Sequence, residues 1–63
     1  ETLDKIRRDV TSLKENSSVV VKLGRLIEHR GRHTVYQRAK ELGYIVKTMQ
    51  HPEGLIVFRL PAA

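Results

Sequence analysis

A basic run marks the part of the chain whose side chains are best suited to chemistry. The run Arg30–Thr34 reads Arg-Gly-Arg-His-Thr, and it leads into the polar residues Gln37, Arg38 and Lys40. Guanidinium and ammonium groups are permanent hydrogen-bond donors, and imidazole donates as well. Arginine in particular forms bidentate hydrogen bonds with phosphates and with guanine. The pattern therefore predicts a partner rich in negative charge, and nucleic acid suits it better than a small-molecule substrate.

The excess positive charge is confined to the middle of the chain. The net charge is +5; residues 18–47 hold seven Lys or Arg against two Glu, while residues 1–17 and 48–63 are each neutral overall. A localised basic patch is the electrostatic footprint of a protein that binds a polyanion. The alternative is a surface whose charges serve only solubility.

Residues for other kinds of chemistry are missing or badly spaced. His29 and His33 are four apart, but the chain has no cysteine and no carboxylate at the spacing of a third metal ligand. Ser17, Ser18 and Thr34 have no histidine and acid in a plausible catalytic geometry, Glu28 and Glu41 do not form a catalytic pair, and the four glycines are dispersed. We therefore predict no enzyme, no catalytic residue, no cofactor and no metal site.

Length and composition predict one small α+β domain. The 63 residues are 40% hydrophobic, and because cysteine is absent a packed core must hold the chain together. No run of about 20 apolar residues exists, so we expect no membrane partner. We also expect an intracellular location, a monomeric isolated domain, and a fragment of a longer protein as the source of this sequence.

Apolar periodicity predicts the elements of the first half. Residues 2–15 carry Leu3, Ile6, Val10 and Leu13 at spacings of three and four, which is typical of a helix with one buried stripe. Residues 18–22 are β-branched and predict a short strand. Residues 23–29 have helical apolar spacing in spite of a glycine at position 24, and residues 29–31 are expected to form a turn.

A second helix and a hairpin are predicted for the remainder. From about residue 32 to 42, Val35, Ala39 and Leu42 share one helical face, and Gly43 stands where a left-handed C-cap usually falls. On a helical wheel the opposite face carries His33, Gln37, Lys40 and Glu41, with Thr34 and Tyr36 at its flanks. Packing on the core edge is favoured for Tyr36 over stacking on a base. Residues 44–49 and 55–60 are strand-like and flank a turn at 51–54.

This order of elements resembles a winged helix-turn-helix DNA-binding domain. The similarity is most specific over Thr34–Val46, which looks like the end of a recognition helix that runs directly into a wing. The resemblance implies that the helix at 32–42 enters the major groove of duplex DNA with His33, Thr34, Gln37 and Lys40 facing outward, and that the hairpin at 44–60 is the wing.

Two other nucleic-acid-binding families resemble the same stretch. Gly24–Gly31 is similar to the K-homology segment in which a Gly-x-x-Gly loop clamps a single strand, although Glu28 stands in place of the first loop glycine. Arg32–Tyr36 is similar to the Arg-x-x-x-His element of a single-strand-binding family, with Tyr36 in place of the histidine. That family also has a helix before its first strand and a closing hairpin.

The resulting hypothesis is a nucleic-acid-binding module, with duplex DNA as the first expectation and RNA or another single strand as the alternative. A module that binds an acidic protein remains the alternative from another class. Phosphate contacts are assigned to Arg25, Arg30, Arg32, Arg38 and Lys47, which position the domain. Base contacts are assigned to His33, Thr34, Gln37 and Lys40.

Overall fold

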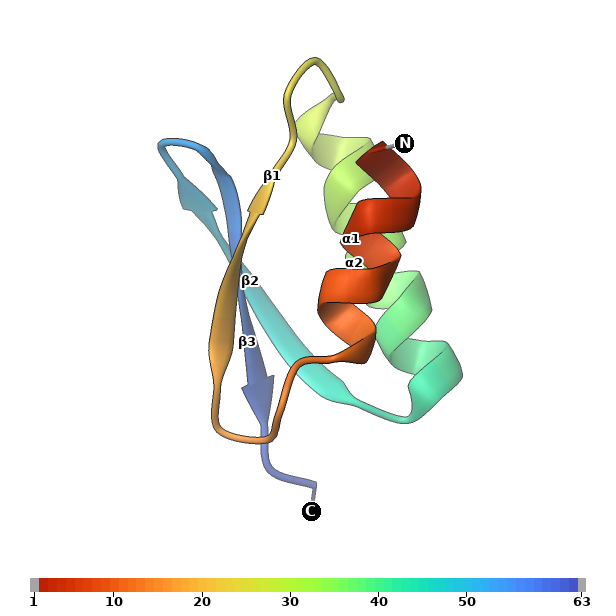
Figure 1. The fold of residues 1–63 in the computed structure, drawn as a ribbon. Coiled ribbons are helices and arrows are strands. Elements are labelled where there is room, and N and C mark those ends of the chain that lie inside the picture. Colours follow the sequence, from red (N-terminus) through yellow and green to blue (C-terminus); the bar gives the residue numbers. More distant parts are fainter. Residues whose placement is uncertain (1, 63) are drawn as a thin grey trace.

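Two helices cover one face of a three-stranded antiparallel sheet (Figure 1). The computed structural model describes residues 2–62. The elements follow the order α1 (Thr2–Thr11), β1 (Ser18–Lys22), α2 (Glu28–Leu42), β2 (Ile45–His51) and β3 (Gly54–Leu60). The strand order in the sheet is β1-β3-β2, so the last strand lies in the centre. The predicted α+β class, the first strand and the hairpin are confirmed.

Helix α1 is shorter than the periodicity predicts. It ends at Thr11 rather than near residue 15, and the hydroxyls of Thr11 and Ser12 each donate to a backbone carbonyl one turn earlier at 2.7 Å. Such bonds compete with the helical backbone ladder and are common where helices end. Asn16 then adopts a positive φ of 62° and turns the chain into β1. Leu13 is buried nonetheless, so the apolar stripe continues beyond the helix.

The predicted middle helix and the turn after it are wrong. Residues 23–27 form a tight turn closed by a bond from the Leu26 amide to the Leu23 carbonyl at 2.9 Å. Gly24 has a φ of +59°, which a right-handed helix cannot contain. Gly31, the expected turn glycine, lies inside α2, where a side chain would overlap Leu23. Since α2 is one unbroken helix, no helix-turn-helix unit exists within residues 2–62.

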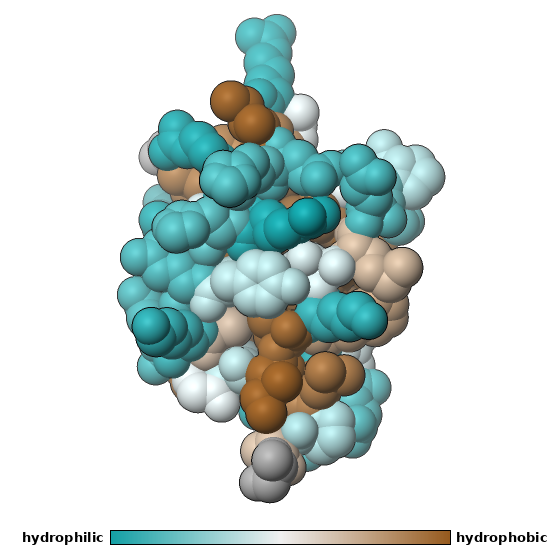
Figure 2. All heavy atoms as spheres, turned by 180° about the vertical axis from the view of Figure 1, so that it is seen from behind, coloured by the Kyte–Doolittle hydropathy of each residue, from teal (hydrophilic) through white to brown (hydrophobic). Residues whose placement is uncertain are grey.

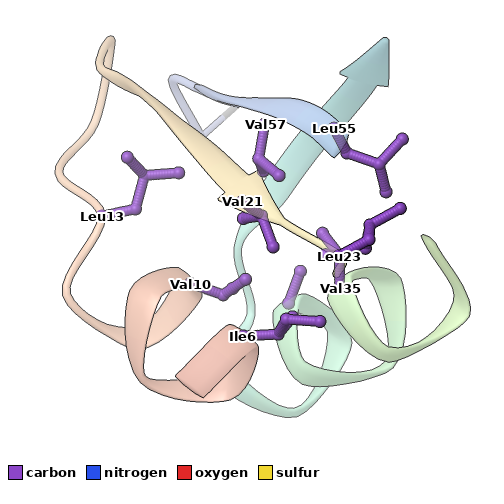
Figure 3. Packing of buried hydrophobic residues seen from close by; sticks show 9 residues of the cluster. Ile6, Val10, Leu13, Val21, Leu23, Val35, Leu55 and Val57 are labelled. Atoms are coloured by element: carbon purple, nitrogen blue, oxygen red, sulfur yellow. The ribbon is translucent and has the colours of Figure 1, made fainter. Parts of the chain in front are cut away.

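The core lies between the helix pair and the inner face of the sheet (Figure 3). Ile6 and Val10 of α1 meet Val35 of α2 and the inward side chains of the strands, Leu55 and Val57, all of them at most 1% exposed. Burial of each such side chain stabilises the fold by about 1.5–3 kcal/mol before conformational entropy is counted. This cluster fixes α2 on the sheet and determines which of its sides faces solvent.

At the end of the domain where α1 stops and β3 finishes, polar contacts that periodicity does not predict join the sheet to the segment after α1. The guanidinium of Arg59 lies 3.5 Å from the ring centroid of Tyr44, and its Nη1 donates to the carbonyl of Leu13 at 2.9 Å. The Tyr44 hydroxyl donates to the carbonyl of Thr11 at 3.1 Å. These contacts satisfy carbonyls left open where α1 ends, and they tie the hairpin to the segment after α1.

Candidate nucleic-acid interface

Helix α2 exposes one continuous polar strip along its length. The residues of this strip lie within a narrow sector of the helical wheel and are all exposed: His29, Arg30, His33, Gln37 and Lys40. Within residues 2–62, neither Arg30 nor Lys40 forms an ion pair. Both acids of the helix lie outside the strip and are paired, Glu28 with Arg32 at 3.2 Å and Glu41 with Arg38 at 2.9 Å. The strip therefore offers free donors and positive charge to solvent.

A shallow groove of about 320 Å³ lies between the strip and α1. The two helices run side by side in the same direction (Figure 1). Leu3 and Arg7 of α1 line one wall, and four strip residues together with Thr34 line the other. Arg7 also pairs with Asp4 at 3.0 Å on the exposed side of α1. The groove thus has donors on both walls and one apolar lining residue, Leu3, a combination that accepts an anionic group.

Three residues assigned to binding are engaged inside the fold. Thr34 was expected to face outward, but it is only 7% exposed, and its hydroxyl donates to the Arg30 carbonyl at 2.9 Å. Arg32 pairs with Glu28 at 3.2 Å. Arg38 pairs with an acid on its own helix, and its Nε donates to the Thr11 hydroxyl at 3.1 Å. The expectation that Thr34 faces outward is therefore wrong, and the two arginines are partly committed to intrachain partners.

Two of the predicted phosphate contacts, Arg25 and Lys47, lie outside α2. Arg25 is exposed in the turn that precedes α2. Lys47 lies between Val46, which packs on the core, and Thr48, which contacts α2, so strand alternation directs Lys47 to the opposite face of the sheet. The structure therefore brings together Arg30, His33, Gln37 and Lys40 from the predicted set, and separates Lys47 from them.

Tyr36 joins the strip to the edge of the sheet. Its hydroxyl oxygen accepts hydrogen bonds from the backbone N–H and from the hydroxyl of Thr48, both at 3.2 Å. Tyr36 is nevertheless 42% exposed, one helical turn before Lys40. The ring is fixed by β2 and still presents surface to solvent, which is the requirement for a platform on which a base stacks.

Other hollows and clusters of the described chain do not form a better site. A hollow of about 350 Å³ lies beside Glu28, Gln50, His51 and Pro52, where the carboxylate disfavours an anion. No group of three or more potential metal ligands occurs among residues 2–62. In the same part of the chain, no helix has both the length and the apolar character required to cross a bilayer.

Three residues of the groove were not among the predicted site residues: the apolar Leu3 and the two possible donors His29 and Arg7. The signal for His29 was its spacing of four from His33, which places both on one face of a continuous helix. The expected turn at Gly31 concealed it. Arg7 belongs to a helix whose charges alternate in sign, so its proximity to α2 follows only from the packing of the two helices.

The α2 and β2 side of the molecule is largely hydrophilic, with a hydrophobic cluster in its lower half (Figure 2). Fold and surface together define a small α+β domain with two helices and a three-stranded antiparallel sheet. No protein-family model matches the chain, and neither a curated protein nor a solved structure is significantly similar to it.

Proposed function

We propose that this domain binds single-stranded nucleic acid, RNA or DNA, along the exposed strip of α2. The observation that carries the proposal is the unbroken row of donors on one helix face, with two unpaired cations and no acid within it. Arg30 and Lys40 contact phosphates, and His29, His33 and Gln37 donate to phosphate or base edges. Tyr36 stacks on a base.

Helix packing favours a single strand over a duplex. Helices α1 and α2 lie beside each other in one layer, so the surface that contains the strip is about 20 Å wide when two helix diameters are allowed for. The major groove of B-DNA is about 12 Å wide, so α1 would meet the phosphate walls before α2 reached the bases. A flexible single strand instead follows the groove between the helices.

The order of elements is also consistent with this form of the proposal. The Arg-x-x-x-His resemblance implies a helix before the first strand and a closing hairpin. The chain has α1 before β1, and β2 and β3 as the last two elements of the fold. The winged-helix resemblance requires a helix between β1 and α2, and residues 23–27 form a turn there. The agreement supports a single-strand-binding module and does not itself establish the family.

Fluorescence anisotropy tests the proposal. The chain is titrated into labelled single-stranded RNA, single-stranded DNA and duplex DNA of the same mixed sequence, at low and moderate salt. We expect single strands to bind more tightly than the duplex, with affinity that falls steeply as salt rises. Preference for the duplex would refute the single-strand proposal, and no binding to any of the three at low salt would refute nucleic-acid binding altogether.

Charge-removal variants locate the interface. Arg30→Ala should weaken binding of all sequences about equally and flatten the salt slope by roughly 0.7–1, the value for one lost phosphate contact. Lys14→Ala is the matched control, because Lys14 is an exposed cation in the segment after α1, away from the strip. Equal salt slopes for the wild type and Arg30→Ala would contradict the assignment.

A further inference from the structure

The outer face of the sheet is apolar although no described element covers it. Strand alternation and register place these hydrophobic residues on that face: Val20, Ile45, Met49, Ile56, Phe58 and Leu60. None of them belongs to the core cluster or packs against it. Met49 is 53%, Ile45 44% and Leu60 43% exposed. Antiparallel sheets with one solvated face normally carry polar side chains there.

The contrast within β3 makes the pattern clear. Leu55 and Val57 point to the core and are 0% exposed, while their neighbours Ile56 and Phe58 point the other way and are half-buried. Strands that are apolar on both faces are typical of sheets that are covered on both faces. Both helices of residues 2–62 lie on the inner side, so an element that covered the outer face would come from outside this part of the chain (Figure 1).

The charge on this face selects among possible occupants. Lys47 lies opposite Phe58 in the middle of the face, and Lys22 lies near its end, where Glu53 approaches it at 4.0 Å. The strand positions of the face contain no acid. A second copy packed face to face would bury two Lys47 ammonium groups without a carboxylate to pair with them, which is strongly unfavourable. The occupant must therefore carry acidic residues.

The dimensions of the face match one helix. Three strands span about 10 Å from first to last, which is one helix diameter, and seven-residue strands are about 23 Å long, the length of a helix of about 15 residues. We propose that the outer sheet face binds an amphipathic helix of a partner protein, with an apolar stripe against Phe58 and a carboxylate opposite Lys47. This proposal is independent of nucleic-acid binding, because the strip of α2 lies on the other side of the sheet.

Two synthetic peptides of about 15 residues test it. Both carry leucine at helical spacing; one has glutamate and the other lysine at every flanking position. The chain, labelled with ¹⁵N, is titrated with each peptide. We expect the glutamate peptide to bind and to shift amide signals of β2 and β3, with the lysine peptide at least about tenfold weaker. Absence of binding, equal affinity for both peptides, or shifts confined to α2 would overturn the proposal.

Charge-reversal variants distinguish a specific contact at Lys47 from an effect of the overall net charge of the domain. Lys47→Glu should lower the affinity for the glutamate peptide at least about tenfold and raise the affinity for the lysine peptide. Lys14→Glu makes the same change of net charge away from the face and should leave both affinities almost unchanged. Met49→Ser, at a side chain that is 53% exposed, should keep the fold and lower the affinity at least about fivefold. Equal effects of the two charge reversals, concentration-dependent dimerisation through this face, or binding there of anionic lipid vesicles in preference to the glutamate peptide would each refute a partner helix.

Discussion

Gly54 offers the most direct test of how the sheet is assembled. It opens β3 and is the register partner of Lys22 at the end of β1. Its φ is +152°, a backbone conformation that residues with a side chain rarely adopt. A β-carbon at this position would overlap the carbonyl oxygen of Val21 and lie 3.0 Å from the amide nitrogen of Leu23. Both neighbours are backbone atoms, so no rotation of a side chain relieves the overlap.

The expected loss for Gly54→Ala is a large part of the total stability. Backbone strain contributes about 1–3 kcal/mol, and displacement of β1 from β3 adds about 1–3 kcal/mol of overpacking and disrupted backbone bonds. A domain of 63 residues has a free energy of unfolding of about 3–9 kcal/mol. We expect Gly54→Ala to be destabilised by about 3–4 kcal/mol and to be partly unfolded at 37 °C.

Gly24→Ala is the matched control. Gly24 also has a positive φ, of +59°, but an added β-carbon would meet nothing within 4 Å. It should lose only about 1–2 kcal/mol from backbone strain. Urea unfolding followed by the helical circular dichroism signal measures both variants. Equal losses would refute the steric argument and leave only the backbone conformation as the reason for glycine at position 54.

Three further predictions concern the cap, the polar closure and the stacking platform. Gly43→Ala should lower the free energy of unfolding by about 1 kcal/mol, because Gly43 ends α2 with a φ of 75°. Arg59→Met should lower it by about 2 kcal/mol through loss of the Leu13 carbonyl bond and of the contact with the Tyr44 ring, and Arg59→Lys should not restore it. Tyr36→Ala should weaken binding of single-stranded RNA by about 1–3 kcal/mol, whereas Tyr36→Phe should retain it.

Each of these predictions has an outcome that contradicts it. Full stability of Gly43→Ala in urea unfolding would mean that the C-cap does not need glycine. Recovery of wild-type stability in Arg59→Lys would show that charge alone, and not the planar guanidinium over the ring, stabilises this end of the domain. Equal RNA affinity of Tyr36→Ala and wild type in anisotropy titrations would remove Tyr36 from the interface.

Apolar periodicity predicted the helices and strands whose buried residues share one face. It did not predict the roles of the glycines, because Gly24 was expected in a helix and Gly31 in a turn. The stripe of Ile6 and Val10 and the β-branched strands report burial directly, because each buried position requires an apolar side chain. Gly24 and Gly31 carry no such information. One provides a left-handed backbone and the other makes room for Leu23, and only the packed structure distinguishes these roles.

The candidate site was predicted in outline for a similar reason. The row of Arg30, His33, Gln37 and Lys40 follows from helical spacing, so a wheel is sufficient to find it. Burial of Thr34 depends on where α1 lies. The ion pair of Arg32 with Glu28 depends on the extension of α2 back to Glu28. Contacts between elements decide these cases, and a single sequence without an alignment does not encode them in any local pattern.

The strand order also has a consequence for synthesis on the ribosome. Within residues 2–62, strand β1 pairs only with β3, which ends at Leu60, although about 30 residues separate the two strands in the chain. The valines of β1 therefore emerge long before their partner exists, and α1 lacks the sheet on which it packs. We expect the nascent domain to hold an unpaired apolar strand until Leu60 has left the exit tunnel, so that the sheet forms only after the whole domain has emerged.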